Sequence, residues 1–404
     1  MTGSPGAAEP GPGRGPLVCI ATSIHPDYDA RVFRHARSMA EAGFEVDLVC
    51  PWEPGRFPLP AGLRIVPFRR AGRRLTRPFL VPARLVPLLL ARPYRLYHVH
   101  DLDVLPLFAL LKLILRRPVV YDCHENYAEE MLYRAYRGVP GWVRPLLALA
   151  VRWTERLCAG VIRDVIAVVP KQLQTFPAPW FRTLVVRNFA ERSLEAGRAD
   201  DLAGRAPACV SIASQYVNNG ALFVLDVARE VVRRRPEVRF HAVDRFGTDL
   251  GLRARVLEGA AAPELAGRFS LLPNVPPPEI MQNLNRATIG LALDFPVPAR
   301  LGALPIKLFE YMAAGLPIVA ADLPNIRQVV EDAGCGVLVR PGDARAFADA
   351  ICGLVDDPAR ARALGDRGLA AFRSRYNWES EVGKVADLYR RRLEARDGER
   401  SPAE

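Results

Sequence analysis

Short apolar runs alternate with amphipathic segments along the first part of the chain. Residues 17–22 form an apolar run and residues 44–50 alternate apolar with polar side chains, and both patterns are typical of strands. Between them, Phe33, Ala36 and Ala40 recur on one helical face of residues 30–42, and Gly43 stands where helices commonly end. A strand, a helix and a strand with short connections indicate a parallel sheet. Further strands are predicted at residues 96–100, 119–123 and 165–168.

A second series of the same kind follows residues 187–188. Strands are predicted at 208–213, 238–243, 289–293 and 318–321, with helices at 221–234 and 305–314. Two consecutive halves of this kind predict an α/β protein of two doubly wound Rossmann-like domains, residues 17–186 and 187–375, facing across a cleft at the carboxyl ends of their strands. Residues 1–16 are rich in Gly and Pro and are predicted to be a disordered tail. Residues 376–404 are predicted to hold a helix that packs back across the hinge, followed by a tail.

Composition narrows the class of protein. The chain has 404 residues and a formal net charge of +11, yet it contains only four lysines, so its basic character comes from arginine. A basic surface attracts phosphate-bearing small molecules or an anionic membrane. No nucleic-acid-binding module appears, and we expect no nucleic-acid partner. The seven cysteines lack any C-x-x-C spacing, and neither residues 1–16 nor the apolar run 102–115 suits a signal peptide or a membrane span. These features predict a cytoplasmic protein.

The segment 304–319 carries the densest candidate chemistry. Pro305 suits a first helical turn, Gly315 suits the position just after a helix, and Pro317 follows the end. Lys307 and Glu310 are three residues apart and share a helical face. A lysine near a helix N-terminus suits phosphate, and a nearby carboxylate can accept hydrogen bonds from ribose hydroxyls. The alternative is a surface ion pair; the rarity of lysine in this chain favours the functional interpretation.

Several motifs together resemble the family 4 glycosyltransferases, a retaining family with the GT-B fold. Residues 304–345 contain Glu310-Tyr-Met-Ala-Ala-Gly-Leu-Pro317 and the later run 334–343, which resemble the donor-binding half of that family. The resemblance spans about residues 17–394, with looser matches at 29–31, 121–125, 186–189 and 376–379.

The resemblance implies an enzyme that moves a sugar from a nucleotide-sugar, with a UDP-sugar favoured, to a glycan, lipid-linked or small-molecule acceptor with retention. Glu310 matches the second acid of the family's E-x7-E pattern, which contacts the ribose, and His124 matches a histidine beside the transferred sugar. These two are the predicted catalytic residues. The predicted donor-binding residues are Lys307, Glu310, Arg300, Asn219, Ser214 and Leu308. The predicted acceptor-side residues are Asp29, Arg31, His100, Asp101 and Glu125.

Three departures from the family pattern concern the donor site. Gly302 replaces the first acid of E-x7-E, and Asn219 stands where a diphosphate-binding lysine is expected. The glycine-rich loop after the first strand is replaced by residues 22–30. Arg300 or Lys307 could supply the lost positive charge. The alternative function is therefore a catalytically attenuated GT-B protein that acts as partner or activator of another glycosyltransferase.

The histidines and neighbouring carboxylates leave three local alternatives. His98 and His100 share a strand face, and a metal site with Asp101 or His124 has suitable spacing. Hydrogen-bonding imidazoles explain the same residues, so the prediction is no metal and no cofactor. Residues 122 and 125 bracket His124, and their carboxylates either orient that imidazole or cap a helix starting near residue 126. Residues 29 and 31 contact the acceptor or pair with each other.

Residues 68–95 are basic and apolar together. Such a segment can lie on an anionic membrane, where a lipid-linked acceptor would be found. It can equally form a helix that packs on the core with a solvated arginine face. The first alternative predicts peripheral contact with the inner face of the plasma membrane.

Overall fold

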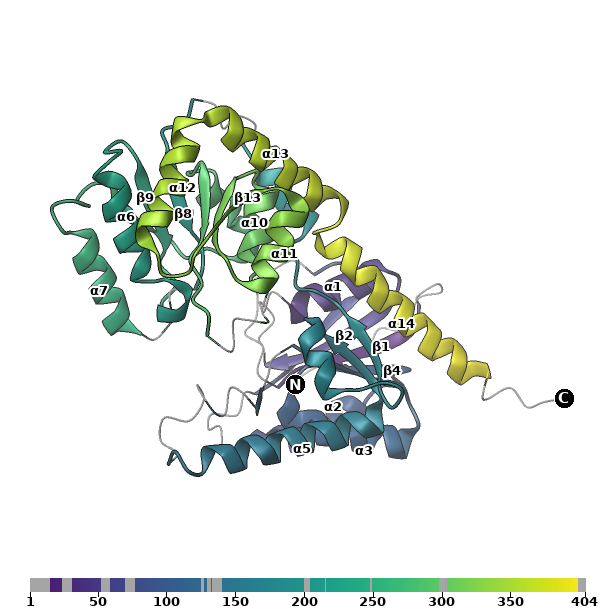
Figure 1. Cartoon of the computed structure of the whole chain (residues 1–404). Coiled ribbons are helices and arrows are strands. Elements are labelled where there is room, and N and C mark those ends of the chain that lie inside the picture. Colours follow the sequence, from purple (N-terminus) through teal and green to yellow (C-terminus); the bar gives the residue numbers. More distant parts are fainter. Residues whose placement is uncertain are drawn as a thin grey trace, which may run out of the picture. The chain divides into compact units, whose positions relative to one another are not determined.

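The computed structural model describes residues 15–23, 31–51, 59–69, 77–124, 127–128, 132, 140–199, 204–214, 216–247, 249–297, 302 and 304–398 (Figure 1). The chain divides into two compact units. Unit 1 contains the residues up to Val186 and those from Val382 on, and unit 2 contains Arg187–Glu381.

The centre of unit 1 is a seven-stranded parallel sheet in the order β3-β2-β1-β4-β5-β6-β7. Its strands are β1 (Leu17–Ala21), β2 (Glu45–Pro51), β3 (Leu63–Phe68), β4 (Leu96–Val99), β5 (Val119–Cys123), β6 (Asp164–Ala167) and β7 (Arg182–Val185). Because β1 pairs with both β2 and β4, the strand order reverses beside β1. Loops that leave the sheet there diverge to opposite faces and leave room for a ligand.

Four helices and the end of a fifth surround this sheet among the described residues. They are α1 (Val32–Glu41), α2 (Arg77–Leu90), α3 (Leu105–Leu115), α5 (Arg144–Ile162) and the part of α14 (Trp378–Gly398) from Val382 on. In α2, Val81, Leu85 and Leu89 recur every four residues and are buried in the core. The helical part of the basic, apolar segment 68–95 therefore packs against the core, as the second of its two predicted alternatives requires.

Unit 2 is built on a six-stranded parallel sheet in the order β10-β9-β8-β11-β12-β13. Its strands are β8 (Ala208–Ser211), β9 (Arg239–Val243), β10 (Phe269–Leu272), β11 (Ile289–Ala292), β12 (Ile318–Ala321) and β13 (Gly336–Val339). Its helices are α6 (Phe223–Val232), α7 (Leu250–Ala260), α8 (Met281–Leu284), α10 (Lys307–Ala313), α11 (Pro324–Ala333), α12 (Ala344–Asp356), α13 (Pro358–Ser374) and the start of α14. The strand order reverses between β8 and β11.

These two sheets confirm the predicted fold class, an α/β protein with two Rossmann-like domains. The predicted helix at 305–314 is shorter in the structure, where α10 spans seven residues and ends before Gly315. Gly315 has φ +68, a left-handed conformation that glycine adopts without strain.

Candidate active-site residues

In unit 1, the loop after β1 is joined to the end of β4 by Asp101. Thr22 Oγ1 donates to Oδ2 of Asp101 at 2.5 Å, and the backbone N–H of Ser23 donates to the same oxygen at 2.7 Å. Asp101 is fully buried. Asp101 is one of the predicted acceptor-side residues. In the structure its carboxylate joins the ends of β1 and β4, where the strand order reverses.

Asp122, near the end of β5, lies at the centre of a group of imidazoles. Its Oδ2 lies 3.6 Å from Nδ1 of His35, 3.7 Å from Nδ1 of His100 and 3.8 Å from Nε2 of His98. His35 comes from α1, while His98 and His100 come from β4 and the residue after it. All four side chains are fully buried. Sequence analysis found His98 and His100 on one strand face but did not bring His35 or Asp122 to them.

Arg31 supplies the positive charge that this group needs. Its Nη2 lies 3.0 and 2.9 Å from the two carboxylate oxygens of Asp122. Arg31 is itself buried and also donates to the carbonyl of Val186 at 3.5 Å. A buried carboxylate is stable when it is paired and hydrogen-bonded. The two predicted alternatives for Arg31 were contact with the acceptor or a pair with Asp29, and neither included Asp122. Asp29 lies outside the described residues, as do Glu125 and Arg300.

Burial controls the charge of the imidazoles. It lowers the pKa of His98 to about 4 and lowers the pKa of His35 and His100 well below their usual value. The three rings are therefore neutral at pH 7. Nδ1 of His98 lies 2.5 Å from the hydroxyl of Tyr389 in α14, so the helix that ends the chain also contacts this group.

His124 is the member of the group that reaches the surface. Its side chain is 9% exposed, whereas those of His35, His98 and His100 are fully buried. Its Nδ1 lies 3.8 Å from Oδ1 of Asp122 and 3.3 Å from the backbone oxygen of the same residue. The backbone and carboxylate oxygens of Asp122 thus position His124, which is the kind of support that a histidine needs to contact a ligand reproducibly.

The buried group also has the composition of a metal site. Ligand atoms of His35, His98, His100 and Asp122 all lie within 4.8 Å of one another, and imidazole with carboxylate is a ligand set that zinc accepts. This set differs from the one with suitable sequence spacing, since Asp101 binds Thr22 and Ser23 instead. Arg31 already occupies both oxygens of Asp122, so a dication there would add uncompensated charge to a fully buried site.

In unit 2, Lys307 pairs with a carboxylate that sequence analysis missed. Its Nζ lies 2.5 Å from Oδ2 of Asp294, and both residues are buried, with 4% and 3% of their surface exposed. Lys307 is therefore not part of a surface ion pair with Glu310. Asp294 follows β11 at its carboxyl end, where parallel sheets place binding residues. That position was the signal that could have identified it.

Tyr311 fixes α10 against the sheet. Its hydroxyl donates to the carbonyl of Leu291 at 2.9 Å and accepts from the backbone N–H of Ile212 at 3.2 Å, so it bridges β11 and the end of β8. A Cβ on Gly290 would lie 2.5 Å from the Tyr311 ring. Glycine at this position thus allows the ring to sit on the strand. Lys307 and Glu310, on the same helix, are held beside the reversal of strand order.

The remaining predicted donor residues have structural contacts. Nδ2 of Asn219 donates to the backbone oxygen of Ser214 at 2.8 Å, which closes the loop between β8 and α6. Leu308 is fully buried in the core of unit 2, one residue along α10 from Lys307. Glu310 is half-buried. Of the described donor candidates, Glu310 is therefore the one with a charged side chain that is partly exposed.

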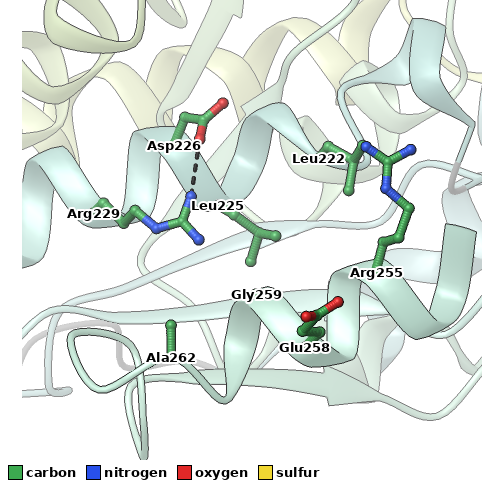
Figure 2. Close-up of a pocket in the computed structure, with 8 residues that line it drawn as sticks. All are labelled: Leu222, Leu225, Asp226, Arg229, Arg255, Glu258, Gly259 and Ala262. Carbon is green, nitrogen blue, oxygen red and sulfur yellow. Dashed lines mark hydrogen bonds and ion pairs between the residues drawn. The ribbon is translucent and has the colours of Figure 1, made fainter.

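A separate hollow of about 530 Å³ lies between α6 and α7 (Figure 2). Its wall includes Asp226 and Arg229, which form an ion pair at 3.0 Å, and Glu258 on the facing helix. None of the described donor candidates lines it. The hollow is a space between two helices at the surface of unit 2.

Comparisons with known proteins identify the family. The family model described as "Glycosyltransferase Family 4" matches residues 30–169, and the model described as "Glycosyl transferases group 1" matches residues 206–357. The first match lies within unit 1 and the second within unit 2.

Three known proteins illustrate the similarity. GDP-mannose:cellobiosyl-diphosphopolyprenol alpha-mannosyltransferase of Xanthomonas oryzae pv. oryzae is 24% identical over 332 residues, which cover 80% of each chain. Sucrose-phosphate synthase of Thermosynechococcus elongatus has a TM-score of 0.73 at 17% identity, covering 94% of this chain and 100% of that one. Anabaena HepE in complex with UDP and glucose has a TM-score of 0.67 at 15% identity, covering 93% and 99%.

The chain belongs to the family 4 glycosyltransferases, and its two Rossmann-like units have the GT-B fold. It is a glycosyltransferase by family.

Proposed function

We propose that this protein is a retaining glycosyltransferase that moves a hexose from a nucleotide-sugar to a lipid-linked acceptor. The observation that carries the donor half of the proposal is the half-buried Glu310, one helical turn from the buried Lys307–Asp294 pair and beside the reversal of strand order in unit 2. The acceptor half is supported by the Xanthomonas relative, whose name specifies a diphosphopolyprenol-linked acceptor.

Each residue has a distinct role in this proposal. Glu310 accepts hydrogen bonds from the ribose hydroxyls of the donor. The ammonium of Lys307 keeps N–H donors beyond the one directed at Asp294, and these stabilise the diphosphate as it leaves. His124 contacts the transferred sugar from unit 1. In this proposal Lys307 supplies the charge stabilisation, and the reaction requires no metal.

Nucleotide binding tests the donor site. We expect calorimetric titration with UDP, GDP and ADP, in EDTA, to give micromolar binding of one nucleotide and to identify the base. Glu310→Gln should weaken that binding at least tenfold, because a neutral amide accepts weaker hydrogen bonds than a carboxylate. His124→Ala should bind the nucleotide normally and lose about 10²-fold or more in transfer rate.

The matched control is Glu258→Gln, an exposed glutamate that lines the hollow between α6 and α7. It should leave nucleotide binding unchanged. If Glu258→Gln lost nucleotide binding and Glu310→Gln did not, the donor site would lie in that hollow. No binding of any nucleotide to the unmodified protein would contradict the proposal and favour a non-catalytic partner of another glycosyltransferase.

A further inference from the structure

Helices α3 and α5 form one continuous part of the surface of unit 1. They contact each other, and α3 contacts β4 and β5 while α5 contacts β5 and β6. Figure 1 shows them side by side below the sheet of unit 1. Each buries one side against the sheet, through residues such as Phe108 of α3 and Ile162 of α5. Their outer sides are therefore adjacent.

The outer side of α5 carries an exposed apolar stripe from Leu146 to Leu157. Leu146, Leu149, Trp153 and Leu157 are between 53% and 66% exposed. Their spacing of three, four and four residues places them on one helical stripe. A soluble surface helix normally carries polar residues there, so this stripe is an exposed apolar face without a described covering element.

Exposed apolar side chains also occur on the elements next to α5. On α3, Leu110, Leu113 and Ile114 are 52–65% exposed. Trp142, just before α5, is 75% exposed. Trp180 is 60% exposed and packs against α5, since a Cβ on Gly160 would lie 3.4 Å from its indole nitrogen. Three of the five tryptophans of the chain thus belong to this surface, which we call the α3/α5 face.

The charges around the α3/α5 face have one sign. Residues 105–118 and 140–163 contain seven lysines and arginines and a single carboxylate, Glu155. Glu155 is buried, binds the hydroxyl of Tyr121 at 2.6 Å, and has its pKa raised by burial. It therefore adds little negative charge at the surface. Arg152 and Arg156 are exposed beside the apolar stripe of α5.

We propose that the α3/α5 face docks onto an anionic lipid bilayer. Leucines and tryptophans would enter the boundary between headgroups and acyl chains, where tryptophan is enriched, and the flanking arginines would bind anionic headgroups. The inference rests on the proposed function, because docking would bring the protein to a lipid-linked acceptor in the membrane. No helix in the part of the chain that the structure describes is long and apolar enough to cross a bilayer.

Charge complementarity favours an anionic bilayer over a second copy of this chain as the partner of the α3/α5 face. Two copies that met through the same face would bring two arginine-rich surfaces together, and like charges oppose that contact. An anionic bilayer is complementary to both the apolar and the basic parts of the face. The proposal also moves membrane contact from residues 68–95, whose helix α2 packs against the core, to α3 and α5.

Vesicle sedimentation tests the docking. The full chain should bind vesicles of phosphatidylcholine with phosphatidylglycerol and remain in solution with phosphatidylcholine alone. Trp153→Glu with Leu149→Glu should reduce binding more than tenfold. Arg152→Gln and Arg156→Gln should each reduce it about fivefold at low salt, and high salt should reduce binding by the unmodified protein. The matched control is Leu250→Glu, a 72% exposed leucine of α7 in unit 2, which should bind normally.

Three outcomes would overturn the inference: no binding to either vesicle, equal binding by Trp153→Glu with Leu149→Glu, or a dimer in solution that this variant dissociates. Quenching of tryptophan fluorescence by brominated lipids in the unmodified protein provides a measurement that does not depend on how the variants fold. Nucleotide titration of the same samples separates the two proposals. Intact nucleotide binding without vesicle binding rejects the docking alone, whereas vesicle binding without nucleotide binding rejects the donor site.

Discussion

Both units bury an ion pair beside the place where their strand order reverses, but they surround it differently. In unit 1, Arg31 and Asp122 are enclosed by the imidazoles of His35, His98 and His100. In unit 2, the Lys307–Asp294 pair is held against an apolar core. In unit 1 titratable imidazoles surround the ion pair, whereas in unit 2 apolar side chains surround it. Two similar sheets thus place a buried ion pair in different surroundings. We expect the two units to respond differently to the loss of one charge and to acid.

The largest expected effect follows from removing one member of the isolated pair. Asp294→Asn should destabilise unit 2 by about 3–5 kcal/mol, because it leaves a buried ammonium without its counter-charge. Hydrogen exchange of β11 and β12 measures this in unit 2 separately. Asp294→Leu with Lys307→Met should restore most of the stability, since an apolar pair removes both charges.

The control for this experiment is an exposed pair in the same unit. Asp349 pairs with Arg234, and its side chain is 67% exposed. Asp349→Asn should change stability by less than about 1 kcal/mol. Equal effects of Asp294→Asn and Asp349→Asn would show that the buried pair contributes no more than an exposed one.

Acid should destabilise unit 1 more than unit 2, and this difference in stability should be smaller than the effect of Asp294→Asn. The pKa of His98 is about 4 in the folded protein and about 6.5 when unfolded, so between these values the unfolded state binds more protons. Stability is complete above pH 6.5 and falls as the pH falls toward 4. At pH 5, His98 alone should lower the stability of unit 1 by roughly 2 kcal/mol. His35 and His100 add to this in the same direction.

Hydrogen exchange at pH 7 and pH 5 compares β4 and β5 with β11 and β12. We expect the protection of β4 and β5 to fall further, since unit 2 contains a single histidine, His241. His98→Gln should reduce the pH dependence of unit 1. A parallel loss of protection in both units would mean that the buried imidazoles do not control acid sensitivity.

The smallest expected effect concerns metal. Because Arg31 already neutralises Asp122, we expect elemental analysis of the purified protein to find far less than one zinc per chain, and EDTA to leave transfer activity unchanged. One equivalent of zinc that disappears in His98→Ala would reverse this prediction and make the imidazole group of unit 1 a metal centre.

The strands that sequence analysis missed share one property. They are β3, β7, β10 and β13, the outermost strands of the two sheets. Inner strands of a parallel sheet are covered on both faces and become continuous apolar runs, which the sequence displays clearly. Edge strands are partly exposed, as in β3, where Arg64 is exposed between buried ends. Polar residues within β3, β7 and β10 make these strands hard to distinguish from loops, whereas β13 is apolar but only four residues long and largely half-buried.

Sequence motifs gave candidate site residues together with expected roles, and those roles stay predictions. Lys307, Glu310 and His124 belong to recognisable segments, and their elements could be predicted from apolar periodicity. The partners Asp122 of Arg31 and Asp294 of Lys307 are distant in the sequence, by 91 and 13 residues, from the residues they bind. Such pairings depend on strand order in the sheet, which local pattern does not encode.

The close approach of Gly290 to Tyr311 restricts how this sequence can change over generations. A methyl group at position 290 collides with the ring, so a substitution there requires a smaller residue at 311. That second change removes the hydroxyl that joins Leu291 and Ile212. We expect a substitution at either position alone to destabilise unit 2, so positions 290 and 311 are expected to change together.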